Sequence, residues 1–126
     1  MKGGDTFRLV GVADRHTWVV LSDSEKDPNR ILIVSFTSFA VGVGMDESCI
    51  VEVDEFSLLT NRSCLYYEDI KELSLANLTS LEGAGKLRRR TPVPTSLLQR
   101  IRDGAIRSPD CKSKFKAILL GQGVVS

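Results

Sequence analysis

The chain has 126 residues, of which 42% are hydrophobic, so it can build one compact core but not two large ones. Lys and Arg number 17 and Asp and Glu number 16, a formal net charge of +1, which excludes a histone-like basic binder and an acidic disordered tail. The charge is unevenly divided, because residues 1–85 carry 7 basic and 14 acidic side chains whereas residues 86–126 carry 10 basic and 2 acidic ones.

The first part of the chain has the composition of β-strands. Segments rich in β-branched and aromatic residues and bounded by turn residues predict strands at 5–10, 16–22, 30–37, 48–53, 63–68 and 70–73. In the first of these, Phe7 and Leu9 share one face, as in a half-buried strand. The segment from Ile31 to Phe36 is nearly all apolar, which predicts a central strand. Gly42 lies in a longer loop between strands.

Helices are predicted mainly near the C-terminus. The expected helices are a short one at 75–81, one from Thr95 or Ser96 to about Ser108, and a last one at 112–120. Residues 88–94 read as an extended linker, because each residue before a proline is disfavoured in a helix. We therefore expect an α+β, mainly β single domain over residues 1–126: a small antiparallel barrel (1–85), a basic linker (86–93) and a helical C-terminal extension (94–126).

Several function classes lack support in the sequence. No apolar run approaches the roughly 20 residues that cross a bilayer, and no signal peptide is evident, so we expect a cytoplasmic protein without a membrane partner. The cysteines Cys49, Cys64 and Cys111 are odd in number and form no CxxC motif, which predicts buried reduced thiols rather than disulfides or a zinc site. Nucleotide-binding loops and hydrolase elbows are also absent, so no metal or cofactor is expected.

Metal-free acid–base chemistry remains open. Cleavage of RNA by its own 2′-hydroxyl needs a proton acceptor, a proton donor and a cation for the phosphate. His16 can transfer protons, Arg15 can hold a phosphate, Thr37 can donate a hydrogen bond to it, and Glu68 or Asp69 can act as a general base or orient the imidazole. The same residues also fit purely structural roles at a strand edge or in turns.

A basic run precedes the C-terminal helices. Lys86, Arg88, Arg89 and Arg90, together with the arginines at 100, 102 and 107, are candidates for contacts with RNA phosphates. Two alternatives stay open, namely that this run is a solvated face, or that the basic C-terminal part packs on the acidic barrel or on a partner subunit.

The order of motifs resembles the MazF/PemK/Kid toxins of bacterial toxin–antitoxin systems over roughly residues 3–82. The resemblance is carried by Gly4-Asp5-Thr6-Phe7, Arg15-His16-Thr17-Trp18-Val19-Val20-Leu21-Ser22, Ile33-Val34-Ser35-Phe36-Thr37-Ser38 and Tyr66-Tyr67-Glu68-Asp69-Ile70-Lys71-Glu72-Leu73. It implies an SH3-like barrel, a homodimer, and a metal-free endoribonuclease that cleaves single-stranded RNA and is inhibited by an antitoxin.

The resemblance also assigns site residues and shows departures. Thr37 matches the catalytic or phosphate-binding threonine of these toxins, and Glu68 a position where some members carry an aspartate base. His16 stands in place of the catalytic arginine, which Arg15 would supply one position earlier. The loop before the second strand is shorter than in the family and the C-terminal part is longer, so the chain resembles a divergent branch.

The competing prediction is a barrel without catalytic activity that binds a protein or peptide, because small barrels host many functions. Trp18, Phe39, Tyr66 and Tyr67 are the candidates for lining its groove. Since Trp18 alternates with Val19, the prediction places one of these two side chains in the core.

Overall fold

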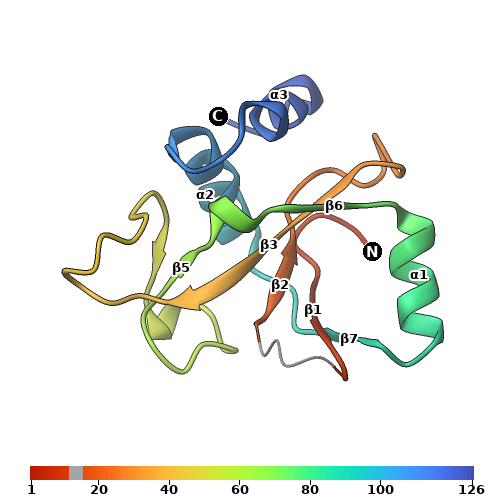
Figure 1. Cartoon of the computed structure of the whole chain (residues 1–126), viewed down its shortest axis with the longest axis horizontal. Coiled ribbons are helices and arrows are strands. Elements are labelled where there is room, and N and C mark those ends of the chain that lie inside the picture. Colours follow the sequence, from red (N-terminus) through yellow and green to blue (C-terminus); the bar gives the residue numbers. More distant parts are fainter. Residues whose placement is uncertain (12–15) are drawn as a thin grey trace.

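The longest strand, β3 (Ile31–Ser38), runs through the centre of one antiparallel sheet in the computed structural model, which describes residues 1–11 and 16–126 (Figure 1). The other strands are β1 (Thr6–Leu9), β2 (Trp18–Val20), β4 (Ile50–Val51), β5 (Ser63–Leu65), β6 (Lys71–Leu73) and β7 (Leu87–Arg90). Their order is β4-β5-β3-β2-β1-β7, with β6 also paired to β3. With three α-helices, this confirms the predicted α+β class, rich in antiparallel strands.

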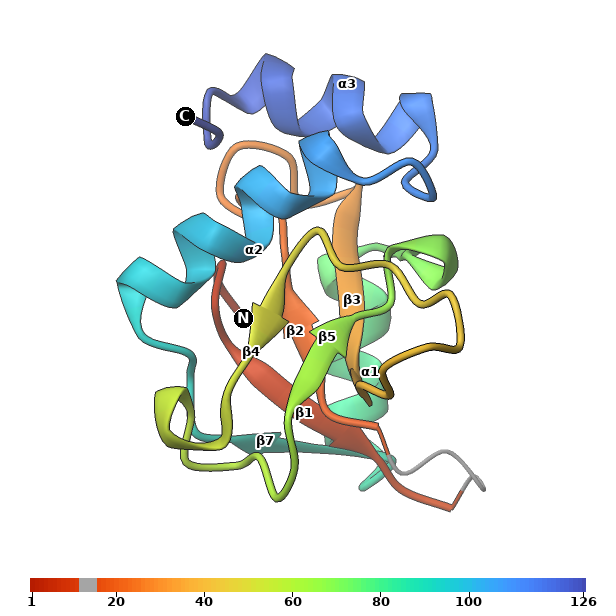
Figure 2. The ribbon, with the colours of Figure 1, turned by 90° about the vertical axis from the view of Figure 1, so that its left-hand side faces the viewer.

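The central strands are buried on both faces of the sheet, because helices cover each side. Helices α2 (Thr95–Arg107) and α3 (Ser113–Gln122) cover one face, and α1 (Leu75–Gly83) lies at the other (Figure 2). Val19 belongs to the core under α2 and α3, whereas Trp18 belongs to the core beside α1. Both side chains of this pair are therefore buried, one more than the sequence required, since the sheet separates two apolar clusters.

The sheet is bent along β3 and does not close into a barrel. Strand β5 pairs with Phe36–Ser38 and β6 pairs with Ile31–Ile33, so the two strands pair with opposite ends of β3. The 3₁₀-helix η2 (Tyr67–Asp69) makes the connecting bend, where the sequence predicted continuous strand to residue 68. Within the described residues, no pairing joins the two ends of the path, β4 and β7, so the predicted SH3-like barrel is an open one.

The segment expected to be a basic linker contains a strand of the sheet. Residues Leu87–Arg90 form β7, which pairs antiparallel with β1 through Leu9↔Leu87 and Thr6↔Arg90. Leu87 is buried in the core beside α1. The linker prediction failed because the prolines that follow, Pro92 and Pro94, indicate extended backbone without showing that it is paired.

The C-terminal helices complete the core. Leu97, Ile101 and Leu119 are buried together with residues of β2 and β3. Helix α2 begins at Thr95, as the sequence predicted, and α3 continues to Gln122, two residues beyond the predicted end at 120. Its C-cap, Gly123, has a φ of 68°.

Three arginines of α2 bind the part of the chain that forms the sheet, and two of them, Arg100 and Arg107, remain exposed. Arg100 pairs with Glu55 and donates to the Ile50 carbonyl at 2.8 Å, and Arg102 donates to the Leu21 carbonyl at 2.7 Å. Arg107 donates to the Ser48 carbonyl at 2.8 Å. For α2, the alternative that the basic part packs on the acidic barrel is therefore confirmed.

All three cysteines are buried and unbridged, as predicted.

Among the residues that the structure describes, no helix is both long enough and apolar enough to cross a membrane.

Candidate functional site

Thr37 lies on a ridge between two hollows at the C-terminal end of β3. One hollow, here called the His16 hollow, has a volume of about 260 Å³ and is lined by His16, Thr37, Ser38 and Asn61 among others. The second, the Glu68 hollow, has about 350 Å³ and is lined by Thr37, Tyr66, Glu68 and Asp46 among others. Two candidates from the sequence, His16 and Glu68, thus flank the third.

His16 is exposed, and its ring is oriented by the backbone of β3. Its Nδ1 lies 3.0 Å from the Phe36 carbonyl, and because a carbonyl only accepts hydrogen bonds, Nδ1 carries the proton in the neutral ring. Nε2 is then the nitrogen that gains or releases a proton. The carbonyl of Phe36 therefore helps to orient the imidazole. Arg15, the predicted phosphate ligand, lies outside the described residues.

Glu68 is exposed on η2, at the bend between β5 and β6. Asp46 and Asp110 line the same hollow, so its lining is acidic. Asp69, the alternative base, pairs with Lys71 at 3.2 Å. In the described part of the chain, no group of three or more His, Cys, Asp or Glu side chains is arranged to hold a metal ion.

The thiol of Cys64 also lines the Glu68 hollow. Burial raises the pKa of Cys64 to about 11, so the side chain is a neutral thiol near pH 7. Because the thiolate is the nucleophilic form of cysteine, Cys64 is a poor candidate for covalent catalysis.

The predicted RNA-binding residues divide between the faces of β7. Arg89 shares a face with Leu87 and binds Glu82 of α1 through Nε at 2.7 Å. Arg88 and Arg90 alternate with it on the other face, where Arg88 lies opposite Arg8 of β1. Lys86 is exposed just before the strand.

Arg8 was missed by the sequence analysis. Only the pairing of β1 with β7, strands about 80 residues apart in the chain, brings it to the arginines of the basic run. Its position on a predicted strand, with Phe7 and Leu9 facing the core, was the available signal.

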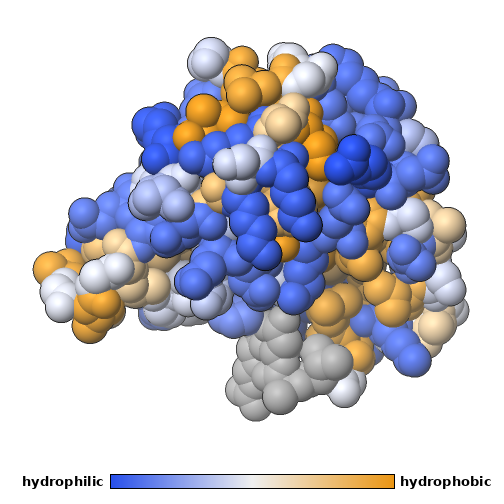
Figure 3. All heavy atoms as spheres, turned by 45° about the horizontal axis from the view of Figure 1, so that its top comes forward, coloured by the Kyte–Doolittle hydropathy of each residue, from blue (hydrophilic) through white to orange (hydrophobic). Residues whose placement is uncertain are grey.

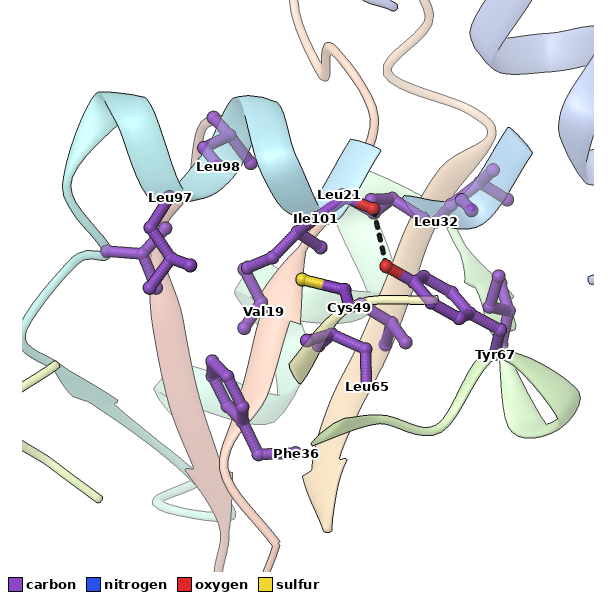
Figure 4. Close-up of a cluster of buried hydrophobic side chains, with 14 of the residues drawn as sticks. Val19, Leu21, Leu32, Phe36, Cys49, Leu65, Tyr67, Leu97, Leu98 and Ile101 are labelled. Atoms are coloured by element: carbon purple, nitrogen blue, oxygen red, sulfur yellow. Dashed lines mark hydrogen bonds between the residues drawn. The ribbon is translucent and has the colours of Figure 1, made fainter. Parts of the chain in front are cut away.

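The predicted aromatic groove does not form as a set. Trp18 and Tyr67 are each 1% exposed, and the Tyr67 hydroxyl donates to the Ile101 carbonyl at 2.7 Å (Figure 4). Tyr66 is 41% exposed and lines the Glu68 hollow. Among the large apolar side chains of residues 1–11 and 16–126, Val41 and Val43 are the most exposed. They lie in the loop that projects from the sheet and forms the hydrophobic tip at the left of Figure 3.

No protein-family model matches the chain, and no curated protein matches it in sequence. The similarity to the MazF/PemK/Kid toxins therefore rests on the short motifs of the strands, and any function drawn from it is a proposal.

Proposed function

We propose that the protein is a metal-independent endoribonuclease of the toxin–antitoxin type that cleaves single-stranded RNA in the cytoplasm by attack of a 2′-hydroxyl. The observation that supports this best is the position of Thr37 between the His16 hollow and the Glu68 hollow. In an in-line displacement at phosphorus, the attacking and leaving oxygens lie on opposite sides of the phosphate. Thr37 lines both hollows, so a proton acceptor in one and a proton donor in the other are available to a phosphate bound at Thr37.

In the proposed reaction, the scissile phosphate lies at Thr37, whose hydroxyl donates a hydrogen bond to a non-bridging oxygen. Glu68 takes the proton of the 2′-hydroxyl as the new P–O2′ bond forms. The P–O5′ bond breaks, and protonated His16 gives its Nε2 proton to the leaving 5′-oxygen. The products are a 2′,3′-cyclic phosphate and a free 5′-hydroxyl, and Arg15 is the residue we propose for the phosphate charge.

The test is cleavage of a fluorescent single-stranded RNA by the purified protein in EDTA. Cyclic-phosphate ends are expected, and His16→Ala and Glu68→Gln should each reduce the rate by about 10²–10⁴-fold, the usual size of a general acid–base contribution. Glu72→Gln is the matched control, because Glu72 is an exposed carboxylate of the neighbouring strand β6 that pairs with Arg30. Intact RNA at high protein concentration, with no growth arrest on expression, contradicts the proposal.

The toxin resemblance also leads us to propose a homodimer and an inhibiting antitoxin protein as the assembly and the partner. One observation favours the alternative of an inactive barrel that binds a peptide. The Glu68 hollow combines the exposed ring of Tyr66 with the carboxylates of Asp46, Glu68 and Asp110, which suits a basic side chain. Intact RNA together with binding of a Lys/Arg-rich peptide, weakened by Glu68→Gln, would support this alternative.

A further inference from the structure

A second charged hollow lies where β1 and β7 pair, at the lower edge of the sheet in Figure 1. This arginine hollow has a volume of about 400 Å³, and its lining includes Arg8, Arg88, Arg89 and Arg90. Arg8, Arg88 and Arg90 share one face of the paired strands. All three residues are exposed. Within residues 1–11 and 16–126, none of the three forms an ion pair with a carboxylate, whereas Arg89 pairs with Glu82. The hollow is therefore a concentration of positive charge that its described surroundings leave uncompensated.

The arrangement of the arginines is unfavourable for the free protein. Arg8 and Arg88 are direct cross-strand partners, and like charges in that position destabilise a sheet. A negatively charged ligand bound between the two arginine side chains would remove this repulsion. The cost in the free chain thus points to an anion as the occupant.

The spacing along β7 indicates which kind of anion fits. Arg88 and Arg90 are two residues apart on one face of a strand, a separation of about 6.6–6.8 Å. The separation of Arg88 and Arg90 is about twice the rise of about 3.4 Å per nucleotide in a stacked strand. It therefore suits neighbouring phosphates of a single strand that is extended and unstacked. Arginine also binds phosphate in a bidentate manner.

The register of the sheet connects this hollow with the His16 hollow. Phe7 pairs with Trp18 at the end of the β1–β2 ladder, and Arg8 and Thr17 are the next residues of the two segments. Thr17 lines the His16 hollow, and its carbonyl accepts the Phe36 amide at 3.0 Å. One row of residues across the sheet therefore leads from the arginines to the proposed catalytic histidine.

We infer that the hollow formed by Arg8, Arg88 and Arg90 binds the phosphate backbone of a single-stranded nucleic acid and leads the strand to the His16 hollow. The binding follows from the arginine hollow alone, and only the naming of RNA as the strand rests on the proposed function. Lys86 and Arg89 are not required for it.

The experiment measures binding of a fluorescent pyrimidine 2′-deoxyoligonucleotide, which lacks the attacking hydroxyl and stays intact, over a range of salt concentrations. The triple variant Arg8→Gln, Arg88→Gln and Arg90→Gln should bind at least about 10-fold more weakly, and the slope of log K against log salt should fall by about 0.7 for each lost phosphate contact. The triple change to Lys should keep most of the slope, because it keeps the charge.

Two controls separate this surface from other charges. Arg30→Gln and Arg62→Gln each remove an exposed arginine that pairs with a carboxylate outside the hollow, Glu72 and Glu52 respectively. Both should leave the salt slope nearly unchanged. Thermal unfolding of every variant checks that it is folded, and the Lys variant supplies a folded comparison if the Gln variant is not.

The inference is overturned if the folded Gln variant keeps the wild-type affinity for the oligonucleotide and the wild-type salt slope. It is also overturned if the Gln variant self-associates but still binds the oligonucleotide, because the arginines then only protect the edge strand β7 from pairing with another chain. It is also overturned if poly-glutamate competes as well as the oligonucleotide, since the site then takes an acidic peptide. Binding that needs the arginines without any RNA cleavage contradicts only the proposed function. RNA cleavage with an unchanged KM in the Gln variant contradicts only this inference.

Discussion

Asp46 anchors the projecting loop to the junction between α2 and α3. Its Oδ1 accepts the Ser48 amide at 2.9 Å, and its Oδ2 accepts the Ser108 hydroxyl. Burial raises the pKa of this carboxyl, but the hydrogen bonds from Ser108 and Ser48 outweigh burial and leave the pKa of Asp46 below its ordinary value. The ionised carboxylate is thus the form that the folded protein binds best.

This lowered pKa predicts a pH-dependent contribution to stability. Because the pKa is lower in the folded chain than the ordinary value of 3.8, the contribution is complete above that value and is lost as the pH falls through the folded pKa. Asp46→Asn should lower the free energy of unfolding by about 1–2 kcal/mol at pH 7. In urea titrations the difference should narrow below about pH 4.

Asp54→Asn is the control, because Asp54 is exposed and should show no such dependence. The loss of unfolding free energy in Asp46→Asn should not stay constant down to pH 2.5, which is about 1 unit below the usual aspartate pKa. A constant loss would contradict the role of the ionised Asp46 carboxylate as an anchor.

Single residues show how far sequence reasoning reaches. His16 and Thr37 were found from their motifs, and the structure brings both to one hollow. Glu68 lies across Thr37 instead of beside His16, because η2 turns the chain away from the strand that the sequence predicted. The neighbours of Arg8 indicated only that it lies on the outer face of a strand, since its place beside other arginines depends on a strand that follows it by about 80 residues.

At the scale of elements, β3 was predictable and β7 was not. The apolar run from Ile31 to Phe36 can be satisfied only by burial on both faces, so its place in the centre follows from composition. The run Arg88-Arg89-Arg90 lacks apolar alternation, and it becomes a strand because β1 offers unpaired backbone groups beside it. Pairing between distant segments is the part that local patterns do not encode.

Helix α2 approaches η2 closely at Gly104, and this contact predicts the effect of adding one methyl group. A Cβ on Gly104 would overlap the Tyr67 hydroxyl and lie 2.9 Å from the Cβ of Cys49. Alanine gains about 1 kcal/mol of helix propensity, but overpacking a core costs about 1–3 kcal/mol. Gly104→Ala should therefore lower the free energy of unfolding, by up to about 2 kcal/mol.

The matched control is Gly121→Ala in α3, where a Cβ meets nothing within 4 Å. There the propensity gain is unopposed, so the free energy of unfolding should rise by up to about 1 kcal/mol. If urea denaturation shows a higher free energy of unfolding for both variants, Gly104 does not lie in close contact with Tyr67.

For the whole molecule, the structure changes the meaning of the charge division along the sequence. The acidic first part and the basic C-terminal part dock on each other through contacts such as Arg100–Glu55. The C-terminal helices share a core with the sheet, although the sequence predicted them as an extension beyond a barrel. Periodicity showed which faces of these helices are apolar, but it did not show that the sheet needs them as a cover.

The two cores share the strands of one sheet, and we therefore predict that the protein unfolds in a single cooperative transition. Leu119 of α3 is fully buried in the core under α2 and α3, whereas Trp18, the only tryptophan, belongs to the core beside α1. Leu119→Ala should cost about 2–5 kcal/mol. Because the strands of the sheet contribute to both cores, Trp18 fluorescence and far-UV circular dichroism should shift to the same lower urea midpoint.

The control is the neighbouring Leu120→Ala, because Leu120 is 57% exposed and its truncation should change the free energy of unfolding by no more than about 0.5 kcal/mol. A loss of helical signal in Leu119→Ala at a lower urea concentration than the change in Trp18 fluorescence would show that the C-terminal helices unfold independently. The strands would then keep the Trp18 core without their helical cover. Coincident transitions instead require that α3, the sheet and α1 form one cooperative unit, with the His16 and arginine hollows on the same rigid sheet.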